Sequence, residues 1–69
     1  MTLPSEDRER LLLALRRVDP DAFRREVRAV LVAQEALGAA AQALRVDART
    51  LAAWIAADPR LAAGLELGP

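Results

Sequence analysis

The hydrophobic residues of this 69-residue chain recur at helical spacing, and breaks in that spacing divide the chain into segments. One apolar stripe of the first segment consists of Leu11, Leu12, Leu15 and Val18. This spacing predicts a helix from about residue 6 to residue 17. Asp19 and Pro20 then end the segment, because Asp19 can cap a following helix and Pro20 suits its first position, where no amide hydrogen is needed.

A second apolar stripe predicts a helix from Pro20 to about Ala36. Its apolar positions are Phe23, Val27, Val30 and Leu31. The basic residues of this segment lie largely on the other side of the predicted helix and are Arg24, Arg25 and Arg28. We expect Gly38 to stop this helix, because glycine adopts positive φ at little cost.

The rest of the chain predicts two shorter helices and a final turn. The first of these helices covers residues 39–44, with Leu44 facing inward, and Arg45 to Asp47 form the turn that follows it. Asp47 then caps a helix that runs to about Ala57. The apolar residues expected inside are Leu51, Trp54, Ile55, Leu61 and Leu65. Residues 1–69 therefore predict one all-α domain, a small four- to five-helix bundle, with Trp54 in its core or, alternatively, exposed as an anchor for a partner.

Residues 39–57 have the pattern of a helix-turn-helix. Two helices that meet steeply need small residues where their backbones approach and apolar residues on either side of the turn. The small residues are Ala40 and Ala41, and Leu44 and Val46 flank the turn. This arrangement is typical of proteins that place the second helix in the major groove of DNA.

The residues that carry a family resemblance form the pattern Ala40-Ala41-x-x-Leu44-x-Val46-x-x-x-Thr50-Leu51-x-x-Trp54-Ile55. Over residues 38–57 this pattern resembles the helix-turn-helix of Fis-type bacterial regulators. The resemblance implies a dimer whose second helices enter successive major grooves. That family usually has glycine at the turn, where this chain has Arg45, so we expect a turn of different shape. Basic residues are common on its second helix, where this chain has Ala48, Ala52, Ala53 and Ala56.

Charge qualifies the expectation of DNA binding. The chain has ten basic and ten acidic residues, and a net charge of zero is mild evidence against a nucleic-acid ligand. The residues that could contact DNA near the turn are Arg49 at a guanine edge, Thr50 at a base or phosphate, and Arg45 at a phosphate. Arg24 and Arg25 could add a phosphate-facing patch, or they could simply form a solvated helix face paired with nearby acids.

Several classes of function have no support in the sequence. The chain contains no cysteine, histidine, lysine or tyrosine, so we expect no enzyme activity, no metal site and no cofactor. The sequence has no run of eighteen apolar residues, so it predicts no membrane span, and the amino-terminal residues lack a signal-peptide core. The cytoplasm is therefore the expected location.

Two functional hypotheses remain. The first is a small regulator or nucleoid-type protein that binds double-stranded DNA with low sequence specificity. The second is a protein-interaction module built on the same helical scaffold, which zero net charge suits better. The first two helices carry more apolar residues than one small bundle can bury, including Leu13 and Val32. We therefore expect a homodimer, or docking of another protein, through these two helices.

Overall fold

The computed structural model describes the backbone of residues 5–67 and the side chains of residues 7–67. Four α-helices and one 3-10 turn follow one another along the described part of the chain: α1 (Ser5–Val18), α2 (Pro20–Gln34), α3 (Leu37–Leu44), α4 (Ala48–Ala57) and η1 (Pro59–Leu61). No strand occurs within residues 5–67. The prediction of a small all-α bundle is confirmed, while the ends of the predicted domain, residues 1–4 and 68–69, lie outside the described residues.

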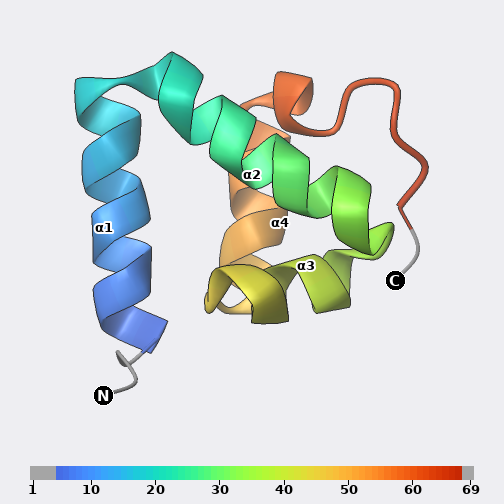
Figure 1. The fold of residues 1–69 in the computed structure, drawn as a ribbon, viewed down its shortest axis with the longest axis horizontal. Helices are drawn as coiled ribbons and strands as arrows, with labels where there is room; N and C mark the ends of the chain where they lie inside the picture. The colour runs from blue at the N-terminus through green and yellow to red at the C-terminus, as the bar shows by residue number, and fades with distance from the viewer. Residues whose placement is uncertain (1–4, 68–69) are drawn as a thin grey trace.

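Helix α2 is the central element of the bundle. It packs against α1, α3 and η1, and α4 in turn packs against α3 and η1. Figure 1 shows α1 standing to one side of α2, with α4 running across the direction of α3 behind α2. After η1 the chain turns back, and its extended segment descends beside the carboxyl end of α2.

The core lies on the side of α2 that faces α3 and α4. Its members are Leu12, Phe23, Val27, Leu31, Ala40, Ala41, Leu44, Val46, Leu51, Trp54 and Leu61. The rings of Phe23 and Trp54 meet edge to face, with centroids 5.3 Å apart, which is a favourable geometry for two aromatic quadrupoles. The prediction that Trp54 belongs to the core is confirmed, because its side chain is only 5% exposed. Trp54 is therefore not an exposed anchor.

The predicted apolar stripe of α1 is only partly buried. Leu12 is buried and Leu15 half-buried, but Leu11 and Val18 are 53% and 85% exposed. The reason is that α1 packs chiefly against one neighbour, α2, so a single helix covers it. Ile55 of α4 is likewise half-buried rather than fully enclosed.

The prediction that Gly38 stops the second helix is wrong. Helix α2 ends at Gln34, and Glu35 adopts the left-handed conformation, with φ 58°, while its N–H donates to the carbonyl oxygen of Leu31 at 3.0 Å. Gly38 lies inside α3 and does not have positive φ. Packing explains the earlier turn: Leu31 and Ala40 are both fully buried, so the chain must change direction before α3 begins.

The connection between α3 and α4 turns at Arg45. This residue has φ 60° and ψ 41°, the left-handed conformation that glycine adopts at least cost. The following N–H, from Val46, donates to the carbonyl oxygen of Ala41 at 3.0 Å, and the Val46 side chain is buried beneath the turn. The absence of glycine therefore does not prevent left-handed backbone at this position.

Substitution of Arg45 should reveal the strain stored in this turn. Arg45→Gly is expected to be more stable than Arg45→Ala by about 1 kcal/mol. Glycine has more conformational freedom in the unfolded chain, which disfavours folding, but the strain of alanine in left-handed backbone is the larger effect. Urea unfolding followed by circular dichroism measures the difference. The control is Ala53→Gly in the exposed middle of α4, which should lose about 1 kcal/mol relative to the native chain. If Arg45→Gly were instead less stable than Arg45→Ala by about 1 kcal/mol, the result would contradict left-handed backbone at Arg45.

Candidate functional site

The candidate site is the exposed corner formed by Arg45 and the first turn of α4, which we call the α3–α4 corner. Asp47 caps α4, as predicted, because its carboxylate accepts a hydrogen bond from the backbone N–H of Arg49 at 2.8 Å. This cap fixes the start of the helix at Ala48 and places Arg49 and Thr50 in its first turn. Buried Leu51 anchors that turn to the core.

Two cations remain on the surface at this corner. Arg45 and Arg49 are both exposed, and Thr50 is half-buried. Among the described side chains, residues 7–67, neither guanidinium has an ion-pair or hydrogen-bond partner. With the carboxylate of Asp47 between them, the corner carries a net charge of +1 from its side chains, and the amino end of α4 adds the positive end of its dipole.

The remaining surface of α4 is almost free of polar groups. The helix has the sequence ARTLAAWIAA, so Arg49 and Thr50 are its polar residues. The exposed positions besides Arg49 are alanines: Ala48, Ala52, Ala53, Ala56 and Ala57. Hydrogen bonding from this helix is therefore confined to its first turn.

Arg24 forms contacts within the fold. Its Nε donates to Asp58 Oδ2 at 3.1 Å, and its Nη1 lies 3.0 Å from Asp21 Oδ1. Asp58 also caps η1, because its Oδ1 accepts from the backbone N–H of Arg60 at 3.2 Å. Arg24 thus connects α2 to the start of the C-terminal segment, residues 58–67.

Arg25, next to Arg24, is exposed on α2. The first turns of α2 lie at the opposite end of the bundle from the α3–α4 connection (Figure 1). The structure therefore brings Arg45, Arg49 and Thr50 together but keeps Arg24 and Arg25 apart from them.

Sequence reasoning missed the role of Arg28. Its guanidinium donates to the backbone carbonyl oxygens of Arg60, Leu61 and Ala63, at 3.1, 3.4 and 2.6 Å. The signal in the sequence is weak: Arg24 and Arg28 are one turn apart and so share a face of α2. Only the tertiary structure brings the C-terminal segment to that face.

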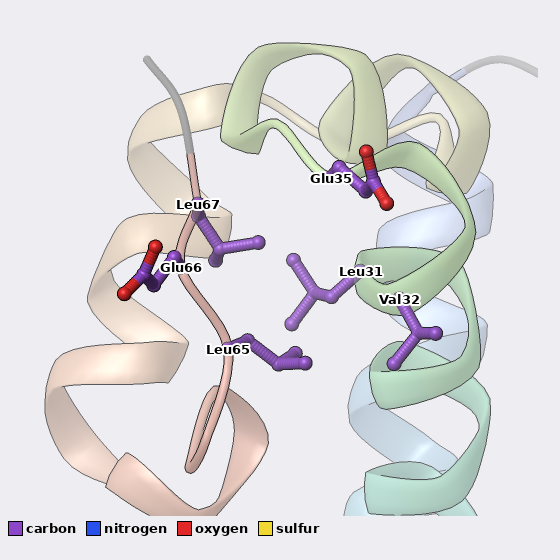
Figure 2. Close-up of a pocket in the computed structure, with 6 residues that line it drawn as sticks. All are labelled: Leu31, Val32, Glu35, Leu65, Glu66 and Leu67. Carbon is purple, nitrogen blue, oxygen red and sulfur yellow. The ribbon is translucent and has the colours of Figure 1, made fainter.

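The same segment also makes apolar contact with the end of α2. Figure 2 shows Leu31 of α2 directed toward Leu65 and Leu67, which point inward from the opposite side of a groove of about 390 Å³. Val32, Glu35 and Glu66 complete its lining. Hydrogen bonds from Arg24 and Arg28 hold the start of the segment against α2, and Leu65 and Leu67 pack against the end of α2.

No group of three or more potential metal ligands occurs among the described residues. Within the same part of the chain, no helix combines the length and the apolar character needed to cross a bilayer.

Comparison with known proteins finds no matching family model, no matching curated protein and no matching solved structure. The resemblance to Fis-type regulators therefore stays a prediction, and the function of the α3–α4 corner has to be inferred from its own chemistry.

The ion pair between Arg24 and Asp58 should make stability depend on pH. Partial burial raises the pKa of Asp58, but hydrogen bonds from Arg24 and from the Arg60 N–H, with both positive charges, outweigh burial and lower it below its usual value. Because the folded pKa lies below the unfolded value, of about 3.9, the added stability is present above that value and disappears as the pH falls through the folded pKa.

Asp58→Asn should therefore be less stable than the native chain at pH 7, and the gap should close as the pH falls below about 4. Urea unfolding at a series of pH values from neutral to acid measures both proteins. In an Arg24→Met background the same substitution should cost less at neutral pH, because the charged partner is already absent. A gap between native and Asp58→Asn proteins that is constant across the pH range would contradict this interpretation.

Proposed function

We propose that this protein binds double-stranded DNA through a helix-turn-helix formed by α3, the connection Arg45–Asp47 and α4. The observation that supports this proposal is the α3–α4 corner, where two exposed and unpaired arginines flank the amino end of an exposed helix. In proteins with a helix-turn-helix, residues at the amino end of the second helix contact base edges in the major groove. Helix α4 takes that position here.

Each side chain of the corner has a distinct role in this proposal. Arg49, in the first turn of α4, donates to the N7 and O6 atoms of a guanine, the commonest specific contact of arginine in the major groove. Arg45, at the turn, contacts a phosphate, and the half-buried hydroxyl of Thr50 donates to a second phosphate. Arg24 is already engaged by Asp58 and Asp21, so it belongs to the fold in this scheme, and Arg25 contributes at most a distant phosphate contact.

Low sequence specificity follows from the composition of α4. Beyond Arg49 and Thr50 its exposed residues are alanines, which offer apolar contact to a thymine methyl and no hydrogen bond. The net charge of zero leaves little long-range attraction, so affinity depends on the few cations of the corner. A regulator or nucleoid-type protein that responds to the shape of the groove fits this surface better than a reader of a strict operator.

A second candidate function is docking of a protein helix on α4. The alanine surface of α4 supports it, because small side chains allow a partner helix to approach closely. In this alternative the arginines of the corner would lie at the edge of the contact and contribute little to affinity.

Loss of the two corner arginines should weaken DNA binding. We expect Arg45→Ala with Arg49→Ala to lower the affinity for a mixed-sequence duplex in low salt by about 10- to 100-fold, and the slope of log affinity against log salt to fall by about 1 for each phosphate that the variant no longer neutralises. Fluorescence anisotropy of a labelled duplex measures both quantities. The matched control, Arg10→Ala with Arg60→Ala, removes the same charge elsewhere and should change affinity about threefold or less. Equal reductions in both double variants would contradict a role for the corner.

A pair of substitutions of opposite charge at Ala52 separates the two candidate functions. If α4 lies in the groove of DNA, Ala52→Arg should raise the affinity for the duplex and Ala52→Glu should lower it, because phosphates respond to the sign of the charge. If α4 packs against a protein helix, both long side chains block the contact alike, and neither changes DNA affinity appreciably. A native chain that does not bind duplex in low salt would exclude the first function.

A further inference from the structure

We propose that a second copy of this chain occupies the groove between α1 and α2, so that the protein is a symmetric dimer. The groove has a volume of about 480 Å³, and its lining consists of Arg8, Leu11, Leu12 and Leu15 from α1 with Ala22 and Glu26 from α2. This inference concerns a surface separate from the α3–α4 corner and does not depend on DNA binding.

The groove combines a protruding leucine with a hollow. Leu11 is 53% exposed, a large apolar side chain left in water. The opposite wall is formed by Ala22, whose methyl group leaves room that a larger side chain would fill. Farther along α1, Val18 is 85% exposed and extends the uncovered apolar surface. In Figure 1 no other helix lies on the outer side of α1.

The rim of the groove carries one charge of each sign. Arg8 lies on the α1 side and Glu26 on the α2 side, yet among the described residues no ion pair joins them. Both charged groups therefore remain available to a partner. A surface with one cation and one anion on opposite walls matches a copy of itself, since a half-turn rotation exchanges the two walls.

A twofold axis that runs along the groove satisfies both features at once. Helix α1 of each copy then faces α2 of the other, so that Leu11 enters the hollow above the partner's Ala22 and Arg8 meets the partner's Glu26. Symmetry makes every contact twice: two leucines leave water, and two ion pairs form at the edge of the apolar contact. A different protein in the groove would make each of these contacts only once. A second copy of the chain makes every contact twice, so we infer that a second copy is the occupant.

The first test compares two substitutions of equally exposed apolar residues. Leu11→Glu should raise the dissociation constant of the dimer at least about tenfold, because two charges would enter the apolar contact. Val32→Glu is the control, since Val32 on α2 is 52% exposed and lies outside the α1–α2 groove, in the lining of the separate groove beside Leu65 and Leu67. Sedimentation equilibrium over a concentration series measures mass, and circular dichroism checks that each variant keeps its helices. A native chain that stays monomeric throughout, or a Leu11→Glu variant that dimerises as well as the control, would overturn the proposal.

The second test uses the predicted ion pairs and stays informative if Leu11→Glu does not fold. Arg8→Glu and Glu26→Arg each place like charges across the interface twice, so each variant alone should be largely monomeric, with a dissociation constant raised at least about tenfold. Mixed in equal amounts, the two variants should form a dimer of one copy each, because every contact then joins opposite charges. The variant with both changes should dimerise by itself. A mixture that stays monomeric would show that Arg8 and Glu26 do not meet across a twofold axis.

Discussion

The fold depends on the burial of one face of α2. Phe23, Val27 and Leu31 are each at most 2% exposed, and they lie one turn apart along the helix. Burying a large apolar side chain completely contributes roughly 1.5–3 kcal/mol, whereas exposed ion pairs contribute much less. Helices α1 and α3 and the turn η1 all pack against α2, and α4 meets it through the contact of Trp54 with Phe23. Without this face, the four short helices would have no common surface.

The polar residues of the same helix explain why some cations serve the fold and others remain on the surface. Arg24 and Arg28 follow the apolar face along α2 and engage the C-terminal segment through a carboxylate and three carbonyl oxygens. In a chain with no net charge, two of ten arginines thereby hold the C-terminal segment against α2. The α3–α4 corner differs because nothing among the described side chains neutralises Arg45 or Arg49. Other exposed arginines, such as Arg25, also lack an internal partner among the described residues, so what distinguishes Arg45 and Arg49 is their position beside the amino end of α4.

The two proposed surfaces lie on different elements and use different forces. The α3–α4 corner has exposed cations above a buried anchor, Leu51, and alanines beyond, so its interaction with DNA would be mainly electrostatic and sensitive to salt. The groove between α1 and α2 has exposed leucine above an apolar floor, so association there would be driven mainly by removal of apolar area from water. A dimer through the groove would carry two α3–α4 corners, and two linked corners on one duplex would bind more tightly than one.

The class of the fold, most helix boundaries and the amino-terminal caps of α2 and α4 could be predicted from the sequence alone. Apolar spacing predicted the helices, and Asp19 with Pro20, and Asp47, marked where α2 and α4 begin, because these signals act over a few residues. The position of the turn before α3 required the tertiary structure: Gly38 offered the better local stop, but burial of Leu31 and Ala40 placed the turn at Glu35. The same holds for the contacts of Arg24 with Asp58 and of Arg28 with the Arg60 carbonyl, which join residues more than thirty positions apart. Helix spacing and caps depend on residues that are close in the sequence. The partner of a side chain depends instead on which distant segments the burial of the core brings together.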